Sequence, residues 1–302
     1  MIQVSGVTHS YGGKKIVLSD IDKKFSSGKI YGIVGPNGAG KTTLLNVISG
    51  INSPKKGTVE IDGFNIKKNR EKALSRIGFM PDRVYLENQS PVLPQIAYFG
   101  TFYGLKYNDS MEKAKSLLAE FGLPKEFWNR PTVRLSLGQR RRVSWVMATL
   151  HNPENLLMDE PYNGFDPFGM RQLTDYILEA RDRGNTVLIS SHILKEVQSI
   201  ADEFIYIDRG RLEKSIETDE IEKASGKVWI RVKNPDDNFT NIVSKFGDVR
   251  RIGQAYELTP NADLGLDVSE INQTVVKEGY KVESIYQEKR TVEDEFFQKK
   301  NN

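Results

Sequence analysis

The sequence contains no cysteine. Disulfides, iron–sulfur clusters, cysteine-ligated zinc and a cysteine nucleophile are therefore excluded. It also has no apolar run near the roughly 18 residues that a helix needs to cross a bilayer, so we expect any membrane role to depend on a partner. The excess of positive charge is small, with a formal net charge of +3 over 302 residues. We therefore expect no nucleic-acid partner, because such proteins normally carry a clear basic patch.

Short apolar runs alternate with helix-like segments up to about residue 208. Residues 29–35, 155–160, 186–191 and 204–208 are rich in apolar and β-branched residues, which predicts strands. The last three are continuously apolar at their centres, as is typical of strands covered on both faces. Residues 171–184 have helical spacing and end at a glycine. This order predicts an α/β fold with a mostly parallel sheet and crossover helices.

The alternation is interrupted once and then stops. Residues from about 83 to 152 are helix-dominated, which predicts a helical insertion in the first domain. Beyond residue 210 the pattern changes to that of a small α+β unit. We therefore expect two domains, over residues 1–215 and 220–302. The elements expected in the second domain are strands at 227–232, 256–260 and 281–289 and helices at 239–247 and 269–279.

A glycine-rich stretch follows the first predicted strand and precedes a helix-like run. Its sequence, GPNGAGKTT, fits the pattern G-x-x-x-x-G-K-[ST] of phosphate-binding loops. The glycines let successive backbone N–H groups point at phosphate oxygens, and the helix start adds positive dipole. We expect Lys41 to reach the β- and γ-phosphates and Thr42 to offer its hydroxyl to Mg²⁺. The predicted nucleoside triphosphate site comprises Gly35, Pro36, Asn37, Gly38, Ala39, Gly40, Lys41, Thr42 and Thr43.

Two acidic residues and a histidine follow other predicted strands. Asp159 and Glu160 end the run NLLMDE, at the edge where parallel sheets bind their ligands. Because adjacent residues on a strand point to opposite sides, we expect them to have different tasks. Asp159 is expected to hold Mg²⁺ through water, and Glu160 to polarise the attacking water as a general base. His192 follows the run at 186–191, and we expect it to contact the γ-phosphate.

A second helix start with anion-binding character lies in the predicted insertion. In RLSLGQRRRVSWVMATL, Ser136 is a suitable N-cap and Gly138 permits close approach. The phosphate loop already surrounds its own nucleotide. A second set of donors could reach the γ-phosphate only from the opposite side, which favours two copies that enclose ATP head to tail in a two-fold dimer. We interpret the next residues, Arg140–Arg142, as a solvated helix face.

With these motifs in this order, residues 1–215 resemble the ATP-binding subunit of an ABC transporter. The resemblance implies the P-loop NTPase fold of ABC ATPases, with N-terminal antiparallel strands beside the parallel sheet and a helical subdomain. It makes His192 the switch histidine and places Asp166, in GFDP, at the dimer seam. It further implies that Tyr11 stacks on adenine. The residues then expected to contact the ATP held by the other copy are Ser136, Gly138 and Gln139.

The sequence departs from the family pattern at two positions. Leu137 stands where the signature motif normally has glycine, and because its neighbours are intact we expect only local adjustment. Asp82, in IGFMPD, stands where the family normally has glutamine. A carboxylate can ligate Mg²⁺ or its water, so we expect Asp82 in the metal site with Thr42 and Asp159. It also adds negative charge near the γ-phosphate and, when ionised, donates no hydrogen bond.

Four aromatic residues in the insertion have two possible roles. Tyr98 with Phe102, and Phe99 with Tyr103, form i,i+4 pairs on adjoining stripes of one predicted helix. They fit the core of the insertion. Some of them also fit a cleft beside residues 78–90, where, by the resemblance, the membrane subunit docks a short cytoplasmic helix.

Together these features predict the ATP-hydrolysing subunit of a membrane exporter for a peptide, drug or polymer. The terminal segment 291–300 resembles that of ABC-2 exporters, and we expect the second domain to stabilise the dimer or modulate hydrolysis. The expected cofactors are ATP and Mg²⁺. The expected partners are a second copy, or a closely related ATPase subunit, and a separate polytopic permease, which would hold the protein at the cytoplasmic face of the cell membrane.

The sequence disfavours two other functions. A soluble ABC ATPase acting on nucleic acid, ribosomes or cluster assembly usually carries two motif sets, a long coiled coil or metal-binding cysteines, and the sequence has none of them. A GTPase-type switch is disfavoured because the guanine-reading motif N-K-x-D does not occur.

Overall fold

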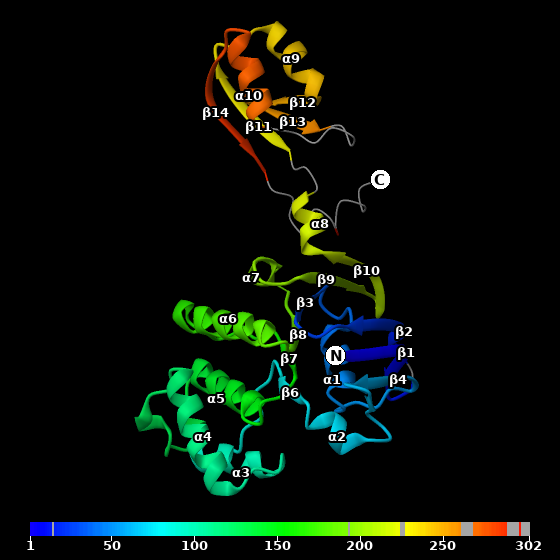
Figure 1. Cartoon of the computed structure of the whole chain (residues 1–302), viewed down its shortest axis with the longest axis vertical. Helices are drawn as coiled ribbons and strands as arrows, with labels where there is room; N and C mark the ends of the chain where they lie inside the picture. Colours follow the sequence, from blue (N-terminus) through cyan, green and yellow to red (C-terminus); the bar gives the residue numbers. More distant parts are fainter. Residues whose placement is uncertain (14, 193, 224–226, 261–267, 289–295, 297–302) are drawn as a thin grey trace. The chain divides into compact units, whose positions relative to one another are not determined.

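The computed structural model describes residues 1–13, 15–192, 194–223, 227–260, 268–288 and 296. The chain divides into two compact units, Met1–Ile216 and Glu217–Asn302 (Figure 1). All residues predicted to bind nucleotide or metal lie in the first unit. The fold of that unit therefore decides which of them meet.

A six-stranded sheet forms the centre of the first unit. β3 (Lys29–Val34) lies in its middle and pairs in parallel with β8 (Thr186–Ser190) and β9 (Glu203–Asp208). β8 pairs in parallel with β7 (Asn155–Asp159), and both are buried along their whole length, which explains their unbroken apolar sequences. The predicted parallel sheet is confirmed. Its full order is β10-β9-β3-β8-β7-β6, with β6 at Ile77–Met80 and β10 at Arg211–Glu217.

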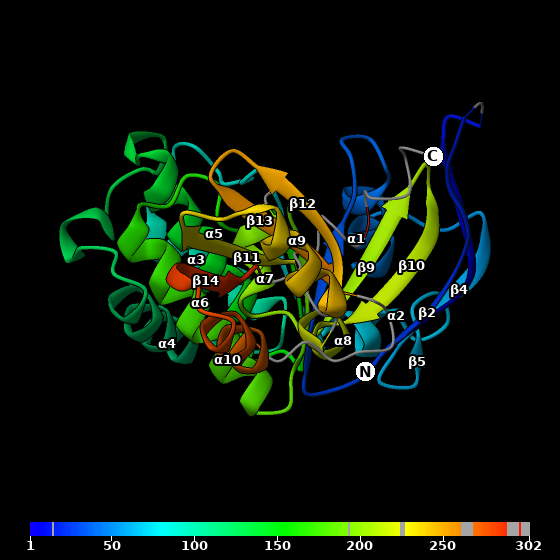
Figure 2. The same cartoon turned by 90° about the horizontal axis from the view of Figure 1, so that it is seen from above.

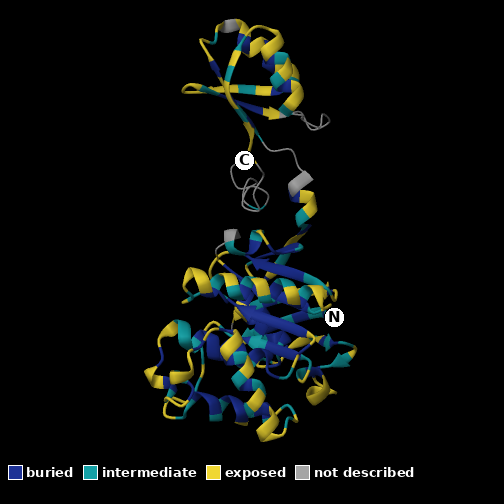
Figure 3. Ribbon diagram, turned by 60° about the vertical axis from the view of Figure 1, so that its left-hand side comes forward, coloured by how far each residue is buried: buried dark blue, intermediate teal, exposed yellow. Residues whose placement is uncertain are grey.

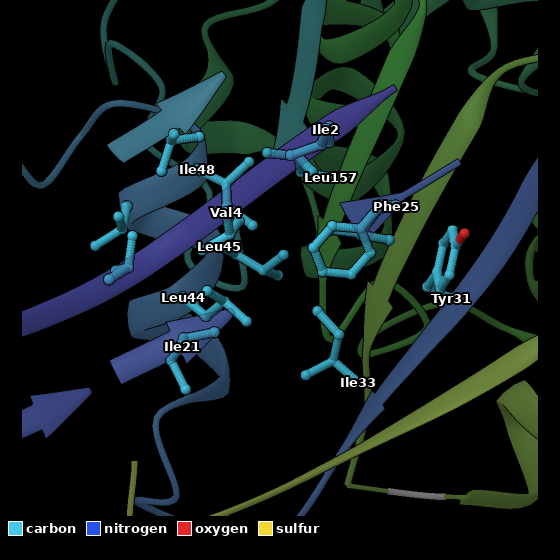
Figure 4. Packing of buried hydrophobic residues seen from close by; sticks show 14 of the residues in the cluster. Ile2, Val4, Ile21, Phe25, Tyr31, Ile33, Leu44, Leu45, Ile48 and Leu157 are labelled. Carbon is cyan, nitrogen blue, oxygen red and sulfur yellow. The ribbon is translucent and has the colours of Figure 1, made fainter. Parts of the chain in front are cut away.

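A second, antiparallel sheet in the order β2-β1-β4-β5 packs against helix α1 (Lys41–Ile48). Leu44 and Leu45 of α1 share one core with Val4 of this sheet and with Leu157 of β7, so α1 is buried between the two sheets (Figure 4). This burial fixes the start of α1, where the phosphate loop ends. The strands are β1 (Ile2–Tyr11), β2 (Lys15–Phe25), β4 (Lys56–Ile61) and β5 (Phe64–Asn65).

Most helices of the first unit lie on the side of the parallel sheet away from β1, β2 and β4 (Figure 2). α5 (Leu137–Thr149) packs against β6 and two further helices, and α6 (Pro167–Asp182) packs against β8. The described residues of the predicted insertion form helices and turns, as expected from the sequence. Buried strands and outward-facing exposed helical residues are visible in Figure 3. The remaining helices are α2 (Arg70–Leu74), α3 (Val92–Thr101), α4 (Tyr107–Glu120), α7 (Leu194–Gln198) and two 3₁₀ turns (Lys125–Phe127 and Thr132–Arg134).

The second unit begins with α8 (Thr218–Lys223) and continues as a strand, a helix, two strands, a helix and a strand. Its antiparallel sheet has the order β12-β13-β11-β14, and one apolar core joins it to both later helices. The predicted strands and helices are present within the described residues. These elements are β11 (Val228–Lys233), α9 (Asp237–Val243), a 3₁₀ turn (Ser244–Phe246), β12 (Gly247–Ile252), β13 (Ala255–Pro260), α10 (Val268–Lys277) and β14 (Lys281–Gln287).

One strand of the second unit was missed. β12 is an edge strand whose last three side chains are all exposed, so it lacks the apolar alternation that predicts a strand. The helix predicted over 239–247 ends at Val243 and gives way to the 3₁₀ turn before β12. Of the terminal segment 291–300, only Phe296 belongs to the described residues.

Candidate active site

The phosphate loop connects β3 to α1 by a tight turn. Gly35 has a φ of 151° and Gly40 a φ of 115°, in the region that favours glycine. A Cβ on Gly35 would lie 2.0 Å from the carbonyl oxygen of Ile207, and one on Gly40 would lie 2.9 Å from the side chain of Leu18. The loop therefore presses against β9 and β2 and leaves no room for other side chains at these two positions.

Lys41 closes this loop. Its Nζ donates to the carbonyl oxygens of Gly35, at 2.7 Å, and Pro36, at 3.3 Å, and the residue is only 7% exposed. Burial lowers the pKa of Lys41, and the nearby carboxylates of Glu160 and Asp159 oppose that effect. The ammonium group is thus held beside two carboxylates at the start of a helix, where an incoming phosphate would compete for it.

Asp159 is the last residue of β7 and is almost fully buried. Its Oδ1 accepts a hydrogen bond from the hydroxyl of Thr42, at 3.1 Å, and another from the hydroxyl of Ser190. Two of the predicted metal residues are therefore in direct contact, and both offer the oxygen ligands that Mg²⁺ prefers. No cluster of three or more histidine, aspartate or glutamate side chains suited to a metal occurs among the described residues.

Glu160 follows the end of β7 and does not continue the strand. Its φ is 48°, and its N–H donates to the carbonyl oxygen and hydroxyl of Ser190, at 3.0 and 3.2 Å. The expectation that Glu160 is a strand residue is wrong, because β7 ends at Asp159 and the backbone turns into the left-handed region at Glu160. The carboxylate Oε2 of Glu160 lies 2.6 Å from the ring Nδ1 of His192. The same oxygen accepts a hydrogen bond from the backbone N–H of His192 at 3.3 Å. The predicted base and switch histidine therefore form a pair.

Tyr11 lies beside the start of α1. Its hydroxyl is 3.4 Å from that of Thr43 and accepts a hydrogen bond from Asn52 at 2.8 Å, and its ring meets His9 edge to face. The residue is 52% exposed, so the ring is accessible next to the phosphate loop.

The predicted dimer contacts lie apart from this group. Ser136 caps α5, and it forms a reciprocal capping box with Gln139. A Cβ on Gly138 would lie 2.7 Å from the carbonyl oxygen of Gly164, so the start of α5 packs closely on the turn before α6. Asp166 caps α6 by accepting from the N–H of Gly169 at 2.7 Å.

Within the described part of the chain, no hydrogen bond or ion pair joins Ser136, Gln139 or Asp166 to the phosphate loop. One copy of the chain therefore brings together the loop, the two acids and His192, whereas Ser136 and Gln139 at the start of α5 hydrogen-bond each other.

The interpretation of Arg140–Arg142 as a solvated face is wrong. Arg141 is 1% exposed and Arg142 is buried, whereas Arg140 alone is partly exposed. α5 carries buried residues on all sides, including Val143 and Trp145, because it packs between β6 and the rest of the insertion. A helix that is apolar on all sides is buried. The mostly apolar residues 143–150, which follow the three arginines, were the sequence signal that this helix is buried.

A cavity of about 620 Å³ lies next to the site. It is lined by all three predicted metal residues, Thr42, Asp82 and Asp159, together with Phe99 of α3 and Tyr103, which follows that helix. Tyr98 and Phe102, the other two of the four aromatics singled out above, are exposed, which contradicts their assignment to the core of the insertion. Their exposed fractions are 61% for Tyr98 and 70% for Phe102.

Comparison with known proteins agrees with this geometry. A family model described as ABC transporter matches residues 18–163. The linearmycin resistance ATP-binding protein LnrL of Bacillus subtilis is 31% identical over 212 residues, covering 70% of this chain and 68% of the relative. The bacitracin transport ATP-binding protein BcrA of Enterococcus faecalis is 27% identical over 307 residues, covering 98% of this chain and 95% of the relative.

A solved structure shares the fold. The dimeric bacterial ABC transporter cassette MJ0796 superposes with a TM-score of 0.67 at 24% identity, over 72% of this chain and 99% of that one. The predicted ABC ATPase fold is thereby confirmed. The chain belongs to the ATP-binding proteins of ABC transporters, and it is an ATPase whose hydrolysis of ATP serves transport.

Proposed function

We propose that this chain is the ATP-hydrolysing subunit of an exporter and that it works as a dimer beneath a separate membrane permease. One observation carries the proposal: Lys41, Thr42, Asp159, Glu160 and His192 meet at the carboxyl ends of adjacent parallel strands and at the start of α1. This is where an open α/β sheet binds its ligands, and these groups suit phosphoryl transfer to water.

Thr42 and Asp159 fit Mg²⁺, because their oxygens are already in contact and Asp82 lines the same cavity. Bound Mg²⁺ would neutralise negative charge on the phosphate oxygens of ATP. Lys41 would hold the same phosphates as a point charge. Glu160 would accept the proton of the attacking water, while His192 would fix its carboxylate and face the γ-phosphate.

The start of α5 supports the dimer. Among the described residues, Ser136 and Gln139 hydrogen-bond each other rather than the phosphate loop of their own copy, and the start of a helix suits an anion. In a head-to-tail pair, either of two copies or of this chain and a close relative, each would complete the site of the other, with Asp166 at the seam. The similar cassette MJ0796 was solved as a dimer.

The cavity beside Asp82 suits a short helix of the permease. Its lining is largely apolar and combines Phe99 and Tyr103 with Phe79 and Tyr85, which fits an amphipathic helix in a groove. None of the helices in the described residues is long and apolar enough to span a membrane. We propose that docking at this cavity holds the protein at the cytoplasmic face of the membrane.

The cargo is proposed to be a peptide, drug or polymer that leaves the cell. Relatives named for linearmycin resistance and bacitracin transport support export. The bacitracin relative matches almost the whole chain, which includes the second unit. We propose that this unit stabilises the dimer or modulates hydrolysis. A chain truncated at residue 218 should then dimerise or hydrolyse ATP differently, and unchanged dimerisation, hydrolysis and transport would contradict this role.

A Glu160→Gln variant tests the proposal. The amide keeps the shape of the carboxylate but cannot accept the proton, so ATP should bind, hydrolysis should stop and the dimer should accumulate. Sedimentation with ATP and Mg²⁺ would show the dimer, and phosphate release would report turnover. Wild-type turnover in this variant, or a strictly monomeric species with ATP, would overturn the proposal. Co-purification of a polytopic membrane protein with the wild-type chain would test the permease.

A further inference from the structure

Arg141 is the most buried charged side chain of the site region, and it contacts two loops, the one after β6 and the one between β7 and α6. Its Nε donates to the carbonyl oxygen of Asn163 at 3.0 Å, and its Nη1 donates to that of Pro81 at 2.7 Å. Its Nη2 donates to the carbonyl oxygen of Glu160 at 3.0 Å and to Oδ1 of Asp82 at 3.1 Å. The residue is 1% exposed, so these four acceptors replace water around the guanidinium.

The contacts of Arg141 join two loops that the parallel pairing of β6 with β7 brings next to each other. Pro81 and Asp82 follow β6, Glu160 follows β7, and Asn163 lies in the turn before α6. A guanidinium is planar and presents its donors in a rigid fork. The positions of its acceptors are therefore coupled. Without it, the carbonyls of Pro81 and Asn163 would lose this donor, and that of Glu160 would keep only the N–H of Asn163.

Glu160 is the acceptor with the least common backbone conformation. Its φ of 48° is unusual for a glutamate and persists only where the surroundings impose it. Ser190 holds the N–H of Glu160 from one side, and Arg141 holds its carbonyl from the other, together with the N–H of Asn163 at 3.2 Å. Because Arg141 also holds the carbonyl of Asn163, its loss would loosen both contacts to this carbonyl, so that the peptide could rotate and carry the carboxylate away from His192.

We propose that Arg141 is a positioning residue for Glu160, and that its bond to Asp82 links the cavity beside β6 to the catalytic carboxylate. The inference rests on the proposed role of Glu160 as the base. The same carboxylate oxygen of Asp82 accepts from Arg141 and, at 3.4 Å, from Asn163. Asp82 lines the cavity and bonds to Arg141, which in turn bonds to Glu160. A ligand that contacts Asp82 in the cavity would therefore affect Glu160 through the side chain of Arg141.

The test compares Arg141→Lys and Arg141→Gln with Arg140→Gln as the matched control. Arg140 is the adjacent arginine of α5, and its guanidinium donates to the carbonyl oxygens of Leu135 and Val133 rather than to the two loops that Arg141 contacts. Steady-state hydrolysis would give kcat and KM, direct titration would give ATP affinity, and thermal unfolding would confirm folding. Arg141→Lys keeps the positive charge but has a single nitrogen, so it separates charge from the fork.

Both Arg141 variants should lose about 10- to 100-fold in kcat, the cost of a misplaced catalytic group. Their KM and ATP affinity should change less than about threefold, because the phosphate loop is untouched. Arg140→Gln should keep the wild-type kcat. A kcat within about twofold of wild type in Arg141→Lys, or a rise in KM without a fall in kcat, would overturn the inference.

The link through Asp82 is tested by a double-mutant cycle. Asp82→Asn keeps the shape and one oxygen acceptor but removes the charge, so it should lower kcat in the wild-type background and change little when combined with Arg141→Lys. Independent, additive effects of the two substitutions would refute the link. Glu160→Gln separates the two proposals: a normal kcat in Arg141→Lys beside a stalled Glu160→Gln refutes only the positioning role. Wild-type turnover in Glu160→Gln refutes the assignment of Glu160 itself.

Discussion

Replacing Lys41 with alanine is expected to weaken ATP binding by a calculable amount. In the free protein the ammonium group has two carbonyl acceptors, which nucleotide binding would exchange for phosphate oxygens. A hydrogen bond to a charged group contributes about 1.5–3 kcal/mol. With 1.4 kcal/mol for each factor of ten, the loss of one such contact raises the Kd for ATP about 10- to 150-fold.

Two further effects of Lys41→Ala follow from its surroundings. Asp159 and Glu160 would lose their neighbouring cation, so their repulsion of the phosphates adds to the loss of affinity. Folding stability should change little, because burial disfavours the charged lysine and lowers its pKa. We expect a shift within about 1 kcal/mol, roughly 2–4 °C in Tm for a domain of this size.

Isothermal titration with ATP and Mg²⁺ would measure the affinity, with Lys67→Ala as the control. Lys67 also donates to a backbone carbonyl, that of Pro54 at 3.2 Å, but it lies outside the site and is exposed. The control should bind ATP like the wild type. A Kd for Lys41→Ala within about threefold of the wild type would refute the assignment of the loop.

Three other predictions concern the first unit. Burial lowers the pKa of His151 from 6.5 to about 4, so the unfolded chain takes up the proton first. Neutral His151 therefore contributes at most about 3 kcal/mol to the free energy of unfolding above pH 6.5, and this contribution is lost as the pH falls towards 4. Urea unfolding at several pH values should show a steeper loss of stability for the wild type than for His151→Gln. Parallel stability curves for the two proteins would contradict this prediction. Gly138→Ala should lower hydrolysis about tenfold or more but leave ATP binding intact, because the new Cβ meets the carbonyl of Gly164; normal hydrolysis would count against a role for this turn. Trp145→Ala, which removes a buried ring stacked on Phe121 at 3.6 Å, should destabilise the protein by about 3–5 kcal/mol, and a loss under about 1 kcal/mol in urea unfolding would show that the core repacks.

The sequence by itself determined the phosphate loop, the parallel strands and the identity of the family. These features depend on the spacing of residues over a short stretch of sequence, which does not depend on tertiary contacts. GPNGAGKTT needs only a strand before it and a helix after it, and both are local patterns. The capping of α5 by Ser136 and the helical insertion were predictable for the same reason.

Only the tertiary structure decided how the surroundings of Glu160 are built. Its left-handed backbone, the support from Ser190 and the burial of Arg141 depend on loops far apart in the sequence. Of the four aromatics at the end of α3 and just after it, Phe99 and Tyr103 line the cavity whereas Tyr98 and Phe102 are exposed, and their helical spacing alone does not say which side the rest of the chain covers. Three consecutive arginines look like a solvated face in a linear pattern, because charge is costly to bury alone. Arg141 donates to three backbone carbonyls of distant loops, and a carbonyl is identical in every residue, so no local sequence pattern reveals these acceptors.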